Sequence, residues 1–351
     1  MVSLFGNLFR RKDHSHGKLR EAEGFRIATP EEVWGNIAPL RKQASQATTP
    51  DAILAYADSV RAAIAGEDTT PWGVKVAAAS HYWIADCENL KGPAEAEAHV
   101  APFEAAYRLR PEPYTAVLLA QACYDVADEF RGTDWTVNTD DASLDLSQQW
   151  NMRGYKALSA QDEAVKIDET GRFDPLNYPW YAQYYNSVSR LTCTHDDVVE
   201  GFNQVIQLDP TNLQLLREHG QDMLPRWYGK DEHSLERFAL WAMEATQQTY
   251  GRGAYAYIYG LIAILGVDVD ETVVNVELLD AGYSDLRQRF PCLNLENEHA
   301  NALSWADAES RVLSLFNEGL RVIDYRAWGG DDEAEGMEYA LNAYTYARDN
   351  G

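Results

Sequence analysis

The sequence lacks three features that would each point to a familiar class of protein. Its four cysteines stand 36, 70 and 99 positions apart, so there is no Cys-x-x-Cys pair and no zinc-ligand spacing. It has no run of 18 apolar residues, since the longest candidate, 254–267, is rich in tyrosine and broken by glycine. Basic residues are scarce, with 30 Lys and Arg against 55 Asp and Glu. These absences argue against a zinc module, a transmembrane helix and a general nucleic-acid binder, which needs a basic face.

What the sequence does contain is enough apolar material for a large folded core. Hydrophobic residues make up 46% of the 351 residues and aromatic residues 11%, so a chain of this length can bury most of its unfolded surface. We expect the cysteines to be buried thiols in a reducing compartment, with two disulfides as the alternative. The expected localisation is cytoplasmic.

The first twenty residues differ in charge from the remainder. They carry five basic residues and one acidic residue, whereas the rest of the chain carries a net charge of −29. Apolar residues between Val2 and Phe9 fall near one helical face and are followed by Arg10, Arg11 and Lys12. This pattern is typical of a short basic amphipathic anchor, which predicts weak contact with the inner face of a membrane. The alternative is a terminal helix that is frayed or docked on the core.

Threonine–proline pairs mark the expected helix starts after residue 28. The pairs at 29–30, 49–50 and 70–71 each place an N-cap hydroxyl before a proline at the first helical position. Gly66 and Gly92 stand where a helix often ends in the left-handed conformation. These signals predict antiparallel helices near 30–45, 50–65 and 71–91.

A short pattern recurs in the middle of the chain. Phe103-x3-Tyr107-x-Leu109-x-Pro111 returns 99 positions later as Phe202-x3-Ile206-x-Leu208-x-Pro210. That shift is three times 33, close to the period of tetratricopeptide helix pairs. The aromatic and aliphatic residues would lie on the buried face of a helix that the proline ends. Two matches at one spacing can also arise by chance.

Helical patterns continue to the C-terminal end, and strand patterns are almost absent. The single β-branched run, 272–276, also fits a helix. Inserts at 132–141 and 170–177 read as non-helical. Further helices are expected at 178–193, 195–208, 231–249, 252–265, 270–288, 296–319 and 331–348. The predicted fold class is all-α, an antiparallel helix-pair solenoid of tetratricopeptide-like type.

The stretch Leu224-Pro225-Arg226-Trp227-Tyr228-Gly229 is the most unusual local sequence. Proline ends the preceding helix, the indole offers a flat apolar plate, and the guanidinium can stack on a ring or bind a carboxylate with two hydrogen bonds. The stretch can therefore form either a structural corner between helices or a ligand site. A related fragment, Arg-Ala-Trp-Gly-Gly-Asp at 326–331, favours the corner, because catalytic residues are rarely duplicated.

Several of these stretches together resemble a known family. It consists of uncharacterised bacterial helical-repeat proteins whose C-terminal half carries the motif Leu-x-Pro-Arg-Trp-Gly-Gly-Ser. The resemblance covers roughly 102–264, and this chain has Tyr228-Gly229-Lys230 where the family has Gly-Gly-Ser. It implies a tetratricopeptide-like fold and no assigned activity. The residues that carry it are Ala127-Asp128-Glu129-Phe130-Arg131-Gly132, Leu208-x-Pro210, Leu224 to Trp227, and Phe238-Ala239.

No motif predicts a metal, a cofactor or a catalytic centre. His14-x-His16, His219 and His233 lack further ligands at metal-binding spacing. The nucleophile motif Gly-x-Ser-x-Gly is absent, and so is a glycine-rich phosphate loop. Gly251-Arg-Gly-Ala254 reads as a turn.

A glycan-active helical toroid is the one enzyme class that the composition supports. Ten Trp and twenty Tyr supply stacking plates, and acidic residues stand near some of them in the sequence. Asp134 is next to Trp135, and Asp331-Asp332-Glu333 follows Trp328. Asp140-Asp141 is another candidate for an acid/base pair. The alternative is that the rings fill helix interfaces and the carboxylates cap helices or face water.

The sequence therefore predicts a protein- or peptide-binding scaffold that recognises a basic partner through an acidic, aromatic-rich groove. The alternatives are the glycan-active enzyme and an immunity-type inhibitor of a cationic toxin. The expected parts are a basic apolar segment at 1–28, helical hairpins at 29–101, a tetratricopeptide-like core at 102–265 and capping helices at 266–351. The candidate binding residues are Arg131, Trp135, Arg226, Trp227, Tyr228 and Trp328.

Overall fold

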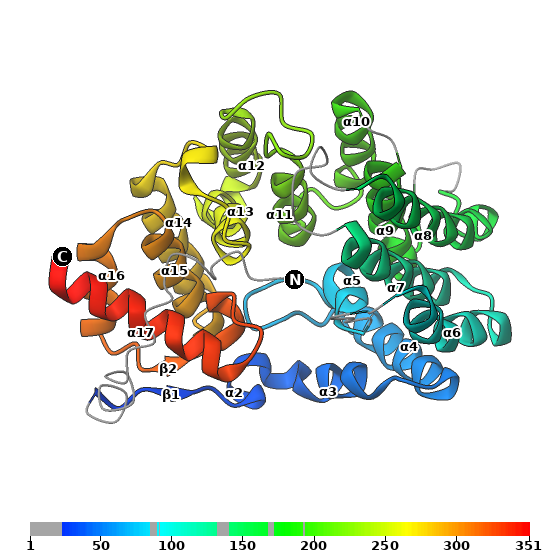
Figure 1. Cartoon of the computed structure of the whole chain (residues 1–351), viewed down its shortest axis with the longest axis horizontal. Coiled ribbons are helices and arrows are strands. Elements are labelled where there is room, and N and C mark those ends of the chain that lie inside the picture. The colour runs from blue at the N-terminus through cyan, green and yellow to red at the C-terminus, as the bar shows by residue number, and fades with distance from the viewer. Residues whose placement is uncertain (1–22, 85–89, 91, 132–139, 168–171, 192–193) are drawn as a thin grey trace. The chain divides into compact units, whose positions relative to one another are not determined.

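The computed structural model describes residues 23–84, 90, 92–131, 140–167, 172–191 and 194–351. These residues are largely helical, and the only sheet among them is one pair of two-residue strands (Figure 1). The chain divides into two compact units. The first comprises Asn36–Thr70 and Val74–Leu215, and the second comprises Pro71–Gly73, Leu216–Gly351 and the described part of Val2–Gly35. The all-α prediction is confirmed.

Helix α7 forms the centre of the first unit. It spans Pro113–Arg131, and thirteen of its 19 residues are buried, so it is covered on nearly all sides. It packs against α6, α8 and α9, and α9 packs against α10. The helices of this unit are α3 (Ala38–Gln46), α4 (Pro50–Ala65), α5 (Val76–Ala79), α6 (Pro93–Leu109), α7, α8 (Asp141–Ser159), α9 (Tyr178–Leu191) and α10 (His195–Ile206), while α11 (Leu213–Asp222) crosses the boundary between the units.

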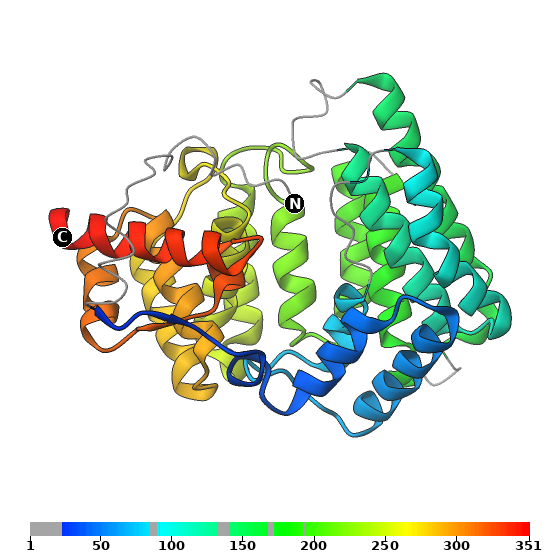
Figure 2. The same cartoon turned by 60° about the horizontal axis from the view of Figure 1, so that its bottom comes forward.

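In the second unit each helix from α12 to α17 packs on its successor along the chain, α13 also packs on α15, and α2 contacts α15. The N-terminal strand β1 (Arg26–Ile27) pairs in parallel with β2 (Val322–Ile323), and α17 lies alongside both strands (Figure 2). The first described segment is therefore built into the C-terminal part of the fold. The helices of this unit are α2 (Pro30–Trp34), α12 (Ser234–Tyr250), α13 (Gly253–Ile264), α14 (Val276–Arg289), α15 (Leu293–Trp305), α16 (Glu309–Asn317) and α17 (Glu333–Asn350).

Single-turn 3₁₀ helices join these elements in both units. They carry the labels η2 (Gly35–Ile37), η3 (Ser80–Trp83), η5 (Asp162–Ala164), η6 (Pro175–Asn177), η7 (Val269–Glu271) and η8 (Tyr325–Trp328). The turn η7 precedes α14, and η8 lies directly after β2.

Local capping signals predicted the starts of several helices correctly. Thr29 caps α2 in a capping box with Glu32, and Thr49 caps α4. Thr194 caps α10. Because such caps involve only neighbouring residues, they can be recognised in the sequence.

The helix predicted at 71–91 is wrong. Thr70 Oγ1 instead accepts a hydrogen bond from Val74 N at 3.0 Å, which closes a tight turn, and Gly73 adopts a φ of +84° within it. A four-residue helix, α5, and the 3₁₀ turn η3 come next along the chain. The single helix predicted at 296–319 is divided into α15 and α16, with Asp307 between them at a φ of +53°. Gly66 ends α4 in the right-handed region, and Glu67 takes the positive φ.

The repeated pattern is only partly buried. Phe103 and Phe202 are core residues, whereas Leu109, which was expected on the same buried face, is 67% exposed. The helices do not keep a period of 33, because α8 begins 48 residues after α6 while α16 begins 33 residues after α14. What the structure supports is packed neighbouring helices rather than a regular repeat.

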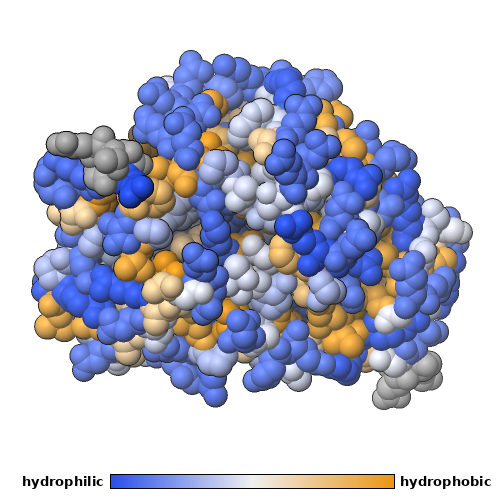
Figure 3. All heavy atoms as spheres, turned by 180° about the vertical axis from the view of Figure 1, so that it is seen from behind, coloured by the Kyte–Doolittle hydropathy of each residue, from blue (hydrophilic) through white to orange (hydrophobic). Residues whose placement is uncertain are grey.

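The described surface combines polar residues with a few exposed hydrophobic side chains. Hydrophilic residues cover most of the face drawn in Figure 3, and hydrophobic residues show as separate patches between them. Among the described residues no helix combines the length and the hydropathy that a membrane crossing requires. The large hydrophobic side chains that stand out from the described surface are Leu109, Met152, Ile167, Trp241 and Tyr346.

Candidate functional site

Arg226 is held by a carboxylate within its own unit. Its Nε donates to Glu271 Oε2 at 2.9 Å, and its Nη2 donates to Glu271 Oε1. Only 13% of the Arg226 side chain and 26% of the Glu271 side chain are exposed. Glu271 is the last residue of η7, so this bidentate ion pair connects the turn after α11 to the turn before α14. The geometry matches the structural interpretation of the corner.

The backbone of this corner requires glycine at one position. Trp227 N and Gly229 N both donate to Leu224 O at 3.0 Å, which folds the chain back on itself. A Cβ at Gly229 would lie 2.1 Å from the carbonyl oxygen of Met223, a backbone atom that cannot rotate away. Position 228 tolerates the half-buried side chain of Tyr228. Packing therefore requires glycine at position 229 but not at position 228.

Trp328 is a core residue rather than a binding surface. It is 1% exposed, its Nε1 donates to Asn297 Oδ1 at 2.8 Å, and its ring stacks on Phe316. The guanidinium of Arg326 lies 4.5 Å from the centre of the Tyr325 ring. In the fragment Arg326-Ala327-Trp328, the tryptophan is therefore part of the interior of the second unit, while the arginine is exposed.

The structure describes five of the six predicted binding residues, and each of the two units contains some of them. Arg131 is the half-buried last residue of α7 in the first unit. Trp135 lies outside the described residues. Arg226, Trp227 and Tyr228 share a half-buried corner of the second unit, whereas Trp328 is buried in the core of that unit.

The least expected feature is a buried row of polar side chains on α15. Asn297, Glu298 and His299 are each at most 4% exposed, and Asn294 and Asn301 are less than 9% exposed. The asparagine amides bond to the segment 322–328, which runs past this helix. The hydrogen bonds run from Asn294 to Asp324 Oδ2, from Asn297 to Val322 O and from Asn301 to Ala327 O.

Glu298 forms a buried ion pair with Arg217 of α11. Arg217 Nη1 lies 3.1 Å from Glu298 Oε1 and 3.4 Å from Oε2, and Tyr283 OH donates to Oε2 at 3.3 Å. The guanidinium also lies 4.4 Å from the centre of the Tyr257 ring. Burial raises the pKa of the Glu298 carboxyl, and the Arg217 charge opposes that rise. One carboxylate therefore joins α11, α14 and α15.

His299 belongs to a second buried polar group. Its Nε2 lies 2.8 Å from Asp280 Oδ1, and its Nδ1 lies 3.3 Å from Arg287 Nη1. Because arginine can only donate, Nδ1 accepts and Nε2 carries the proton. Burial lowers the pKa of His299, and the hydrogen bond that Asp280 accepts from it lowers the pKa of Asp280. Both ring nitrogens are engaged, so the imidazole acts as a cross-link between helices.

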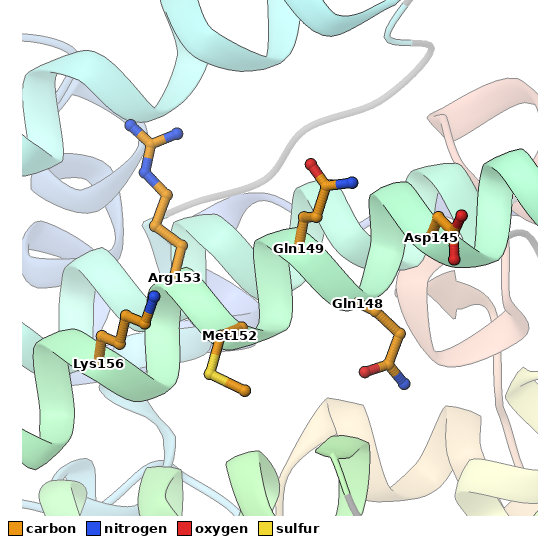
Figure 4. A pocket seen from close by; sticks show the side chains of 6 residues that line it. All are labelled: Asp145, Gln148, Gln149, Met152, Arg153 and Lys156. Atoms are coloured by element: carbon orange, nitrogen blue, oxygen red, sulfur yellow. The ribbon is translucent and has the colours of Figure 1, made fainter.

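A shallow hollow of about 540 Å³ lies along α8 in the first unit (Figure 4). Arg153 and Gln149 project to one side of the helix, and Gln148 and Met152 project to the other. Arg153 is itself occupied, since it bonds to Glu97 and Glu104 of α6. Among the described residues that line this hollow, Asp145 is the single carboxylate.

A second hollow, of about 390 Å³, lies between α12 and α14 in the second unit. Its lining includes Asp285, which already pairs with Arg252 at 2.9 Å. The described lining of each hollow contains one carboxylate, whereas glycoside hydrolysis requires two acting together. Asp140 and Asp332, suggested as acid/base residues, cap α8 and α17 instead.

Arginines of the second unit are largely neutralised within it. Residues 216–351 contain 24 Asp and Glu against 11 Lys and Arg. Seven of those eleven form ion pairs with acidic residues of the same unit. They are Arg217, Arg226, Arg237, Arg252, Arg311, Arg321 and Arg348. The charge left for an approaching partner is therefore predominantly negative.

Within the described ranges no three His, Cys, Asp or Glu side chains are grouped in a way that would hold a metal ion. Comparison of the chain with family models, with curated proteins and with solved structures gave no match.

Proposed function

We propose that this protein is a binding scaffold of packed helix pairs that recognises a basic protein or peptide. The observation that carries the proposal is the neutralisation of arginines inside the second unit. An acidic excess of 13 residues in 216–351 remains after every basic residue there is set against an acidic one. Such a surface attracts cationic partners and raises their rate of association.

The helical architecture supports the same proposal. Packed neighbouring helices are compatible with an irregular solenoid of tetratricopeptide-like type, the class that the family resemblance also implies. Such folds function through extended binding surfaces. The hollows along α8 and between α12 and α14 are shallow and carry one carboxylate each, which favours surface recognition over a reaction centre.

A cationic toxin is one specific form of basic partner. An immunity-type inhibitor would use the same acidic surface, and its support is the same charge distribution. No specific observation favours the glycan-active enzyme.

Binding of the full-length chain to fluorescein-labelled nona-arginine and nona-lysine tests the proposal. We expect fluorescence anisotropy to show binding at about 50 mM salt and clear weakening at about 300 mM, where the Debye length is much shorter. Nona-glutamate with the same label is the control and should not bind. Absence of binding to both cationic peptides at low salt, or equal binding of nona-glutamate, would refute the proposal.

A further inference from the structure

Helix α12 carries a large aromatic side chain at the surface of the second unit. Trp241 is 44% exposed, and it is the one tryptophan among the exposed large hydrophobic residues of the described chain. An indole left in contact with water retains much apolar area that a partner could cover. Exposed tryptophans are also prominent among the residues that contribute most to binding energy at interfaces.

The orientation of this ring is set by its neighbours. Phe238, one turn earlier on α12, stacks on Trp241 with 5.6 Å between ring centres and 28° between planes. Phe238 in turn meets the ring of His219 edge-on at 4.8 Å, and His219 is 2% exposed. The stack is therefore anchored in the interior, which reduces the entropy lost when a partner covers it.

The charges around the ring favour a cation. Arg237, one turn before Trp241, is drawn toward the start of α12 by Asp231 Oδ1 at 2.8 Å and by Ser234 Oγ at 3.0 Å. Glu244, one turn after Trp241, is exposed. Residues three apart on a helix have neighbouring side chains, so a carboxylate stands beside the exposed indole.

We propose that Phe238, Trp241 and Glu244 form an aromatic platform on which an arginine side chain of the basic partner stacks. The inference rests on the proposed function and specifies where the partner is anchored. A planar guanidinium can lie over the indole while it donates to the Glu244 carboxylate. The ammonium of lysine is a point charge without a plane, and it gains less from such a platform.

The test compares variants of the full-length protein with the same two labelled peptides. Trp241→Ala should weaken nona-arginine binding by about two- to five-fold, the value of one exposed cation–π contact. Trp241→Phe should retain most of the affinity, and nona-lysine binding should change less than nona-arginine binding. The matched control is Tyr346→Ala, which removes a 54% exposed aromatic ring from α17 of the same unit and should leave both affinities unchanged.

The outcomes separate this inference from the proposed function. If the parent chain binds both peptides and Trp241→Ala binds nona-arginine equally well, the platform is refuted while the scaffold stands. If Tyr346→Ala loses as much affinity as Trp241→Ala, the platform is likewise refuted. If size-exclusion chromatography shows a dimer that Trp241→Ala abolishes, the ring is covered by a second copy and the inference falls. Glu244→Gln should reduce nona-arginine binding without altering the melting temperature, which shows that the fold is intact.

Discussion

Removing one partner of the buried Arg217–Glu298 pair should strongly destabilise the protein. The side chains are 9% and 5% exposed, so neither charge can be rehydrated without opening the core. In Arg217→Met the carboxylate loses its cation and keeps only the hydrogen bond from Tyr283. Breaking a buried pair in this way costs about 3–5 kcal/mol, a large fraction of the roughly 5–15 kcal/mol that typically separates folded from unfolded protein.

The pH dependence of that cost has a definite sign. Burial raises the pKa of Glu298, and Arg217 opposes the rise, so Arg217→Met should raise the folded-state pKa further above the unfolded value. A carboxyl with a raised pKa penalises folding at high pH, and the penalty shrinks as the pH falls and the group takes up a proton. The destabilisation should be larger at pH 8 than at pH 5.

Urea unfolding followed by circular dichroism, at both pH values, measures these differences. The double variant Arg217→Met with Glu298→Leu should recover most of the loss, because no buried charge is left unpaired. A cost below about 1 kcal/mol for Arg217→Met at pH 8, an equal cost at pH 5, or additive costs in the double variant would refute the reasoning.

Two buried rings give further stability predictions. His81 is fully buried, neither of its ring nitrogens has a hydrogen-bond partner among the described residues, and burial lowers its pKa to about 3. Because the unfolded state binds the proton more readily, stability should fall by up to about 1.4 kcal/mol per pH unit below pH 6.5, and His81→Leu should reduce that slope in acid unfolding. Phe25→Ala should cost about 3–5 kcal/mol in urea unfolding, because the ring packs on Phe316 and Tyr344. Arg26→Ala, which removes an exposed pair next to it, should change little, and equal losses for the two variants would contradict this account.

Elements set by local contacts could be predicted from the sequence, and elements set by distant contacts could not. Thr49 and Thr194 cap helices through bonds to residues three positions on, so their neighbours suffice to identify them. The turn after Thr70 also uses local bonds, yet Trp72 within it is buried against Trp34, a contact that the sequence does not reveal.

The candidate site was harder to predict for the same reason. Arg226 was recognised as unusual, but its partner Glu271 lies 45 positions away. Asn297 and Glu298 look like residues of a solvated helix, because polar side chains are rarely placed in a core unless paired. Their partners, Val322 and Arg217, come from segments that no local pattern connects to α15. The sequence of α15 contains one weak sign that its polar residues are buried: they occur all round the helix instead of on one face.

The parallel pairing of β1 with β2 joins two segments that the ribosome synthesises far apart in time. Glu23 O accepts a hydrogen bond from Arg321, a residue 298 positions later. A ribosome that adds about 5–20 residues per second needs roughly 15–60 s to cover that distance. Until then Phe25 has no pocket, because Phe316 and Tyr344 have not yet emerged. The second unit can therefore complete its fold only after Tyr344 has been synthesised, whereas the first unit, whose last residue is Leu215, can assemble well before that.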